Sequence, residues 1–331
     1  MPIHDLGYRP WEGTYQPRGW RFLVFTKVGI QLALRSRWLK RLVAFAFLQG
    51  LSAVVILYAA ETFVLSDVQQ GHLLAEGVVG IGLSADLWSH QDAAQVLEAL
   101  DPLNPNRDED ARYFIWRLSL LALMRSPQAL LMVLLLGILT PPMISFDIRS
   151  RGFLLFFSRP ITPDEYIIGK SLIVWAYLLT IIAAPALMAY FAVVCLSPSF
   201  TVMTFTWDLP LRILVAAFCV AVPTTALSLC LSALTTESRN ARFAWFAIWA
   251  IGMAAYGILT AVSASTGVNP AEAAKQWQLL SLYHTLGDVE KLVFGVDRTF
   301  GEVLPSLTLL ILLTVGCYWV IRRRVMAPMR V

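Results

Sequence analysis

Residues 171–196 read SLIVWAYLLTIIAAPALMAYFAVVCL, an apolar run without a single Asp, Glu, Lys, Arg or His. A helix of about 20 residues is long enough to cross the roughly 30 Å hydrocarbon core of a bilayer. A lipid-facing barrel strand would instead alternate apolar and polar residues over about ten positions. The run therefore predicts a transmembrane helix.

Five further runs of the same kind bring the predicted transmembrane helices to six, and none of them contains a charged residue or His. The composition agrees, because 15% of the residues are charged, whereas soluble domains carry about 25%. The predicted fold is an all-α polytopic membrane protein. The predicted helices cover residues 42–60, 127–146, 171–196, 213–234, 243–265 and 303–321.

The distribution of basic residues predicts the orientation, because Lys and Arg are retained on the cytoplasmic side of a membrane. Residues 1–41 carry eight Lys or Arg against two acids, whereas residues 61–126 carry four against ten. The connection 147–170 is basic, and three consecutive arginines lie near the C-terminus. Both termini and the 147–170 connection are therefore expected in the cytoplasm.

Two loops are expected outside. Residues 61–126 include a predicted helix at 86–100 and should cap the membrane domain, since a piece of this size buries little core alone. Residues 266–302 show mostly helical spacing and predict a re-entrant or interfacial helix, which is tolerated at membrane depth where protein buries its backbone. Asp92 in the first loop and Glu290 in the second are expected to face outside.

The segment before the first predicted span has the pattern of a basic amphipathic helix. Over residues 20–34 the apolar side chains share one broad arc, and Arg21 and Lys27 lie opposite. Such a helix lies in the membrane interface with its cations near anionic headgroups; packing on another protein is the alternative. The chain then divides into a cytoplasmic tail with an interfacial helix, residues 1–41, and a six-helix transmembrane domain, residues 42–331.

The predicted spans offer no ionisable group that could couple transport to an ion gradient. Prolines inside the spans could break helices, which keeps an ion-coupled carrier open as an alternative. The four histidines lack metal-ligand spacing, and the four cysteines lack a C-x-x-C pair. Residues 169–171 resemble the end of a phosphate-binding loop, but Asp164 replaces its first glycine and would repel phosphate. We expect no enzymatic activity and no cofactor or metal on this chain.

The connection 147–170 combines a helix start with an unusual apolar run. Thr162 as N-cap, Pro163 at the first helical position and Glu165 at the third predict a capping box that begins the third span. Residues 153–157 are five consecutive large apolar residues between charged flanks, and such a patch needs a cover. The run either dips into lipid as an interfacial helix or docks into a cytosolic partner as a coupling helix.

A longer set of residues in this connection follows a fixed order: Asp147, Arg149, Gly152, Ser158, Arg159, Pro160, Ile161, Glu165, Tyr166, Gly169 and Lys170. The order resembles that of the ABC type-2 exporter permeases, in which an acidic residue and Arg follow the second span. Gly, a Ser-Arg-Pro-Ile step and a Glu-Tyr-x-x-Gly-Lys start to the third span come next. The family commonly has Glu where this chain has Asp147. The wider resemblance covers the whole chain.

The resemblance implies a half-transporter whose six helices pair with a second copy or a homologous permease. Two separate ABC ATPase subunits would bind ATP and Mg beneath them, and the dimer would form the translocation pathway of an exporter. The chain would lie in the bacterial plasma (inner) membrane, in contact with lipid and with no nucleic-acid partner. An ion-coupled secondary transporter and a non-transporting membrane scaffold of an envelope complex stay open as alternatives.

The residues expected to couple the permease to an ATPase come from two cytoplasmic connections. The expected docking surface is Phe153, Leu154, Phe156 and Phe157, and the expected partner contacts are Arg149, Arg151 and Arg159, with Glu237 and Arg239 in the second turn. Thr162, Pro163 and Glu165 would form the rigid helix start through which movement of the loop reaches the spans.

Overall fold

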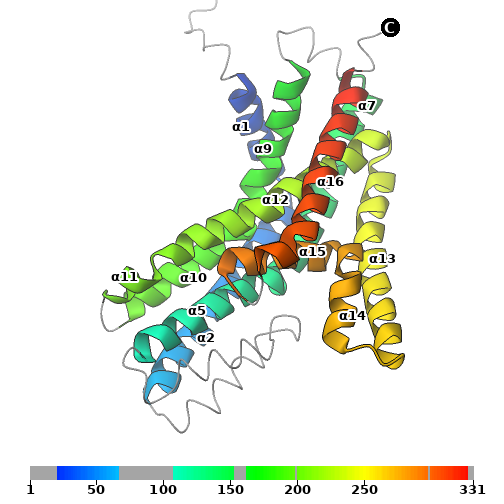
Figure 1. Ribbon diagram of the computed structural model, residues 1–331. Coiled ribbons are helices and arrows are strands. Elements are labelled where there is room, and N and C mark those ends of the chain that lie inside the picture. Colours follow the sequence, from blue (N-terminus) through cyan, green and yellow to red (C-terminus); the bar gives the residue numbers. More distant parts are fainter. Residues whose placement is uncertain (1–20, 67–106, 153–161, 198–199, 297–298, 327–331) are drawn as a thin grey trace, which may run out of the picture.

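The computed structural model describes residues 21–66, 107–152, 162–197, 200–296 and 299–326, and every regular element in these ranges is helical (Figure 1). Within these ranges, six segments are long and apolar enough to cross a membrane, which confirms the predicted all-α fold with six spans. We number them spans one to six: Arg37–Ala59, Arg112–Arg149, Pro163–Leu196, Val202–Leu234, Ser238–Ser265 and Phe300–Met326.

Several spans consist of more than one helix. Span one lies in α2 (Arg37–Ser66), span two in α5 (Arg107–Arg125), α6 (Pro127–Leu139) and α7 (Pro141–Arg149), and span three in α9 (Pro163–Ile181) and α10 (Ala183–Leu196). Span four is α11 (Val202–Thr206) with α12 (Asp208–Leu234), span five is α13 (Ser238–Ser265), and span six is α16 (Phe300–Met326). The remaining elements are α1 (Arg21–Ala33), α14 (Pro270–Trp277), a 3-10 turn (Gln278–Leu280) and α15 (Leu282–Phe294).

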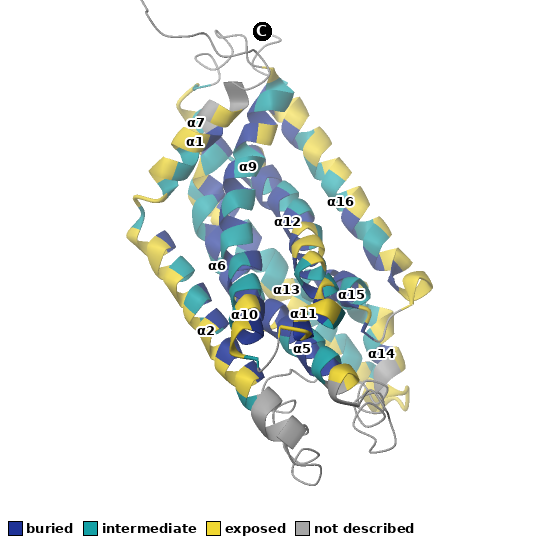
Figure 2. Cartoon of the chain, turned by 90° about the vertical axis from the view of Figure 1, so that its left-hand side faces the viewer, coloured by how far each residue is buried: buried dark blue, intermediate teal, exposed yellow. Residues whose placement is uncertain are grey.

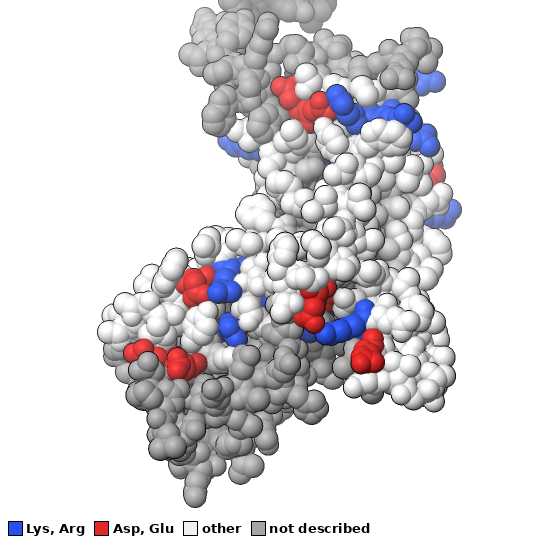
Figure 3. Space-filling view, viewed as in Figure 1, with Lys and Arg blue, Asp and Glu red and all other residues white. Residues whose placement is uncertain are grey.

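The helices run between two ends of the molecule (Figure 1). One end holds α1, α7, the start of α9 and the end of α16, and we call it the loop end because the 147–170 connection joins α7 to α9 there. Helices α11 and α14 lie at the opposite end. On the face seen in Figure 3, charged residues gather towards both ends, and an uncharged band separates them. This separation is typical of a membrane-spanning protein, because charges exposed to hydrocarbon are costly.

Two of the long spans are broken near prolines. Pro141 has no N–H, so the Gly137 carbonyl loses its intrahelical donor. Arg242 from α13 donates to that carbonyl through Nε at 3.2 Å. Span three breaks at Ile182, three residues before Pro185. At the Pro141 break a side chain of a neighbouring helix thus replaces the lost backbone bond, which is one way in which broken helices are tolerated at membrane depth.

Helix α12 forms the centre of the bundle. It packs against α7, α9, α10, α13, α15 and α16, and residues such as Ile213 and Ala217 are fully buried. Helix α13, in contrast, buries Ala241 and Trp245 alone among its residues. Helices α2 and α16 carry exposed residues along one side (Figure 2). The peripheral helices therefore present the kind of apolar surface that lipid or another membrane helix covers.

Span two begins earlier than the sequence predicted, at Arg112 and not at residue 127. Residues 112–126, which we assigned to an external loop, belong mostly to α5, a helix that packs against α2, α10 and α15. This part does not stand out in the sequence as a charge-free run because α5 contains four arginines. The helix predicted at residues 86–100 lies outside the described residues.

The helix predicted at residues 20–34 corresponds to α1, which packs against α9. The Thr26 hydroxyl donates to the Gly169 carbonyl at 3.3 Å, and the Tyr177 hydroxyl donates to the Ile30 carbonyl at 2.7 Å. These bonds attach α1 to the first half of span three. Its placement at a membrane interface stays a prediction.

Between spans five and six the chain turns back into the molecule. Helix α14 packs against α13, and α15 lies among α5, α12, α13 and α16 (Figure 1). Residues 285–290 of α15 are all buried, which agrees with a helix whose backbone is covered by protein. Glu290, which was expected on the outer side of the membrane, is buried within the bundle, and the orientation itself stays a prediction. Its side chain is buried against Arg125 because the cation supplies a charge partner inside the bundle.

Candidate functional site

The two ends of the 147–170 connection meet at a corner of the loop end. On α9, Tyr166 and Lys170 are one helical turn apart and share a face. The Tyr166 hydroxyl donates to Asp147 Oδ2 at 2.5 Å, and the Lys170 ammonium lies 3.0 Å from the same oxygen. Lys170 also donates to the Met143 carbonyl at 2.8 Å. These bonds tie the end of α7 to the first turns of α9, in a place where the Asp147 and Lys170 side chains are largely buried.

A capping box fixes the start of α9. Thr162 has extended backbone angles, and its hydroxyl accepts a hydrogen bond from the Glu165 amide at 3.2 Å. The Glu165 carboxylate accepts one from the Thr162 amide at 2.7 Å. Pro163 occupies the first helical position, where a missing N–H costs little. The arrangement satisfies two backbone donors that a helix start leaves unpaired.

Asp164 joins the same helix start to the end of span six. Its carboxylate accepts a hydrogen bond from the Tyr318 hydroxyl at 2.7 Å and lies 3.1 Å from Nε of Arg322. Both partners are on α16, close to the C-terminus. The start of α9 therefore contacts span two through Asp147 and span six through Asp164.

Two of the charged residues predicted to contact an ATPase lie close to each other. Arg149 at the end of α7 is 3.5 Å from Glu237, which precedes α13, and both side chains are more than half exposed. An exposed pair of this kind contributes at most about 1 kcal/mol, so a partner protein could exchange it at little cost. Arg151 has a positive φ of 54°, and Arg239 is exposed on the first turn of α13. Arg149 and Glu237 thus form an exposed contact at the loop end, and Arg151 and Arg239 each follow one of them by two residues.

Helix α7 is held to span four by one hydroxyl. Ser232 of α12 accepts hydrogen bonds from the backbone amides of Ile144 and Ser145, each at 3.1 Å, and donates to the Pro141 carbonyl at 2.7 Å. The Ser145 hydroxyl contacts that of Ser238 on α13 at 3.0 Å. Helix α7 thus contacts spans four and five as well as three. We call the set of contacts around Asp147, Asp164 and Ser232 the corner.

The predicted docking surface, Phe153, Leu154, Phe156 and Phe157, lies outside the described residues together with Arg159. Both ends of the segment that carries it are attached to the corner, since residue 152 follows α7 and residue 162 caps α9. A force on this segment would reach α7 and α9 first and, through their contacts, span six.

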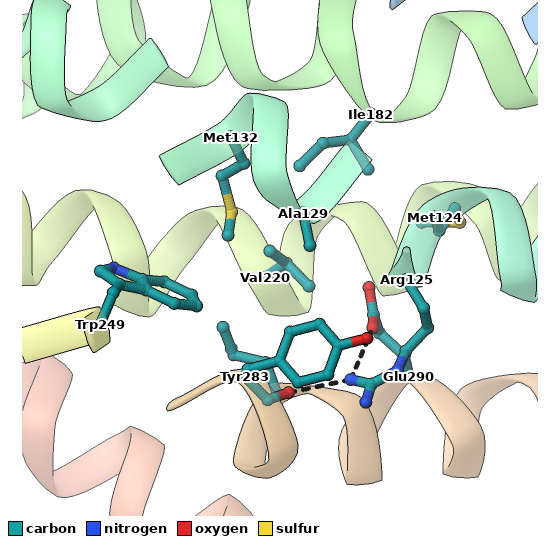
Figure 4. Close-up of a pocket in the computed structure, with 10 residues that line it drawn as sticks. Met124, Arg125, Ala129, Met132, Ile182, Val220, Trp249, Tyr283 and Glu290 are labelled. Atoms are coloured by element: carbon teal, nitrogen blue, oxygen red, sulfur yellow. Dashed lines mark hydrogen bonds and ion pairs between the residues drawn. The ribbon is translucent and has the colours of Figure 1, made fainter. Parts of the chain in front are cut away.

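A second polar site lies deep in the bundle, at a small cavity of about 10 Å³ (Figure 4). The Arg125 guanidinium lies between the backbone of Tyr283 and the Glu290 carboxylate. Its Nη1 donates to the Tyr283 carbonyl at 2.9 Å and is 3.6 Å from Glu290 Oε2. The cavity is lined by Met124, Arg125, Ala129, Met132, Ile182, Val220, Trp249, Tyr283, Leu286 and Glu290.

This ion pair is not predicted from the sequence, because Arg125 and Glu290 fall outside the charge-free runs, in two separate predicted external loops. The available signal was that Arg125 follows the apolar residues 120–124 and that Glu290 shares a helix face with the apolar residues Leu286 and Val293. In the part of the chain that the structure describes, no group of three His, Cys, Asp or Glu side chains could hold a metal ion.

Comparison with known proteins gives one match. The family described as ABC-2 family transporter protein matches residues 27–319, from α1 to near the end of α16. Neither the search of curated proteins nor that of solved structures finds a match.

Proposed function

Because the chain belongs to the ABC-2 transporter family, we propose that it is the permease subunit of an ATP-driven exporter. In this proposal it works as a dimer, with a second copy or a homologous permease, and separate ABC ATPase subunits bind ATP and Mg. The dimer lies in the bacterial plasma membrane with its termini and the loop end in the cytoplasm. The six spans and the family's character as a membrane permease support this assignment.

The observation that carries the proposal is the corner at the loop end. The segment between residues 152 and 162 is attached at one end to α7 and at the other to α9, and these two helices are joined by the largely buried Asp147–Lys170 pair. Because α7 and α9 are joined, a push or pull that reached either end of this segment would act on both helices together. This is the property that a coupling loop needs.

The corner also suggests which spans would move. Span two continues into α7, and span three begins with α9, so both would follow the segment directly. Span six would follow through Asp164, Tyr318 and Arg322. ATP binding would draw two ATPases together, and the cavity between two permease subunits would change its opening as these spans shift.

Of the alternatives, an ion-coupled carrier was disfavoured because the predicted spans lack charges. That reason does not hold, since Arg125, Asp288 and Glu290 are all buried within the bundle. Membership of the ABC-2 family now favours the ATP-driven mechanism. A scaffold without transport activity would also need an explanation for the corner, because a scaffold has no movement to transmit.

Copurification with an ATPase tests the proposal. Phe156→Asp places a carboxylate in the expected docking surface, where burial of a Phe side chain is worth about 1.5–3 kcal/mol. We expect this variant to lose the tagged ATPase at membrane levels equal to those of the wild type. Phe200→Asp is the matched control, because Phe200 is exposed and precedes α11, at the opposite end. Undiminished copurification of the Phe156→Asp variant would remove the docking role of the loop.

A further inference from the structure

Helix α15 is held in the bundle by polar contacts from three different spans. Arg125 of span two bonds the Tyr283 carbonyl in its first turn, and Arg212 of span four bonds the Val293 carbonyl in its last turn at 2.6 Å. Ser306 of span six donates to the buried Asp288 carboxylate at 2.9 Å. The Val293 carbonyl is in the last turn, where carbonyls lack an intrahelical partner, so Arg212 satisfies an otherwise unpaired group there. The position of α15 therefore depends on the relative positions of spans two, four and six.

The contact with Arg125 is a shaped site on α15, which we call the notch. Tyr283, Gly287 and Glu290 are spaced four and three residues apart and share one face of the helix. The Arg125 guanidinium carbon lies 4.2 Å from the centre of the Tyr283 ring. A Cβ at Gly287 would lie 1.5 Å from Arg125 Nη1 and 2.0 Å from Cζ. The absence of a side chain at Gly287 thus leaves space for the guanidinium. The Tyr283 ring and carbonyl and the Glu290 carboxylate surround it.

The notch lies at the middle depth of the spans. Four residues that line the adjoining cavity come from near the midpoints of spans two to five in the sequence; they are Ala129, Ile182, Val220 and Trp249. The cavity has room for about one water molecule. Two helix breaks meet beside it, because Ile182 separates α9 from α10 and Ser126 separates α5 from α6.

Static packing alone does not account for an ion pair at this depth. A buried pair costs so much desolvation that apolar residues of similar size often stabilise a fold as well or better. Among the protein groups that the structure describes, the Arg125 Nε has no hydrogen-bond partner. Arg125 is also the last residue of α5, directly before the break at Ser126 and Pro127. A cation at a helix break, bound by the protein through only some of its five donors, suits a contact that is made and broken.

We propose that Arg125, seated in the notch, is a releasable lock that closes the mid-span cavity towards the end of the molecule opposite the loop end. Span two runs from Arg125 through α6 and α7 to Asp147 in the corner, so movement of the coupling loop would withdraw the lock. This second step rests on the proposed function, whereas the lock itself does not. Arg125 is a positioning residue for α15. The cavity would be closed when the Arg125 side chain occupies the notch and open when that side chain has left it.

Gly287→Ala tests the lock with the smallest possible change. The added methyl group takes the place of the guanidinium, and Arg125 can leave because it is the end of a flexible side chain. Gly257→Ala is the matched control, since a Cβ there meets nothing within 4 Å. Glu290→Gln is a second variant that leaves the notch open to Arg125 but removes the charge partner, in case the alanine variant does not fold.

The readout is the labelling rate of Ala129→Cys in a chain whose four native cysteines are replaced by serine. A membrane-impermeant maleimide is applied separately from each side of the membrane. With the lock closed we expect slow labelling from both sides. With Gly287→Ala or Glu290→Gln we expect labelling at least about tenfold faster from the side of α14, the factor that loss of one charge-assisted hydrogen bond gives. Gly257→Ala should match the parent chain.

Unchanged labelling in both lock variants, with monodisperse protein, would overturn the proposal. Equal acceleration from both sides would overturn it as well, because it would indicate general loosening. These measurements use the permease alone and stay valid if no ATPase partner is found. With a copurified ATPase, ATP should speed labelling of the parent chain from the side of α14. No change with ATP would remove the link between the lock and the coupling loop while leaving the lock intact.

Discussion

Replacement of Lys170 by Met should loosen the joint between α7 and α9. Methionine keeps most of the unbranched apolar stem but removes the ammonium, which lies 3.0 Å from Asp147 and 2.8 Å from the Met143 carbonyl. The ammonium is also 5.4 Å from the centre of the Tyr166 ring. In the variant, Asp147 would keep the hydrogen bond from Tyr166 but lose its counter-charge.

The expected loss is about 2–4 kcal/mol of unfolding free energy. A hydrogen bond to a charged group contributes about 1.5–3 kcal/mol, and a cation–π contact adds about 0.5–1 kcal/mol at a partly exposed site. The Asp147 and Lys170 side chains are 13% and 11% exposed. The loss should therefore stay at or below the roughly 3–5 kcal/mol seen when a fully buried pair is broken.

Unfolding by SDS in mixed micelles measures this loss for the wild type, Lys170→Met, Asp147→Asn and the double variant. The cycle isolates the interaction of the two side chains, and we expect a coupling energy of at least about 1 kcal/mol. Lys275→Met is the control, because its 2.7 Å pair with Glu302 is about half exposed and should contribute at most about 1 kcal/mol. Single effects that add within about 0.5 kcal/mol would refute the pairing of Lys170 with Asp147.

Purified alone, the chain should have no affinity for ATP because its sequence lacks a phosphate-binding loop, and micromolar binding in a nucleotide titration would contradict the subunit assignment. Cysteines introduced at Asp92 and Arg239 should react from opposite sides of the membrane. An impermeant maleimide that labels intact cells at position 239 but not at 92 would reverse the orientation. Thr162→Ala should cost about 1 kcal/mol in SDS unfolding, since it removes an N-cap bond. Ser126→Ala, at an N-cap without such a bond, should change little; equal losses would show that the cap of α9 is unimportant.

The features predicted correctly from the sequence are those whose atoms are close along the chain. The capping box joins Thr162 to Glu165 within four residues, so its residue types alone indicate the two hydrogen bonds that the structure contains. The six spans are also local, because each depends on the mean hydropathy of one continuous segment. Neither prediction needs knowledge of what packs against the helix.

The features that were missed depend on partners far away in the sequence. A window around Arg125 shows a cation next to apolar residues, but the carboxylate that pairs with it comes from Glu290, 165 positions later. The length of span two was underestimated for the same reason, since the sequence cannot show that protein and not lipid surrounds α5. Asp147 and Lys170 were both named from the family resemblance, yet their direct contact emerged from the fold.

The contacts of residues 162–170 limit where a chimera of this permease can be joined. Within them, Asp164 reaches α16, Tyr166 and Lys170 reach α7, and Gly169 receives a bond from α1. Every one of these contacts is made within the chain itself. A graft intended to recruit a foreign ATPase should therefore exchange residues 150–161 and retain residues 162–170. Residues 162–170 fit the other helices of this permease and not its ATPase.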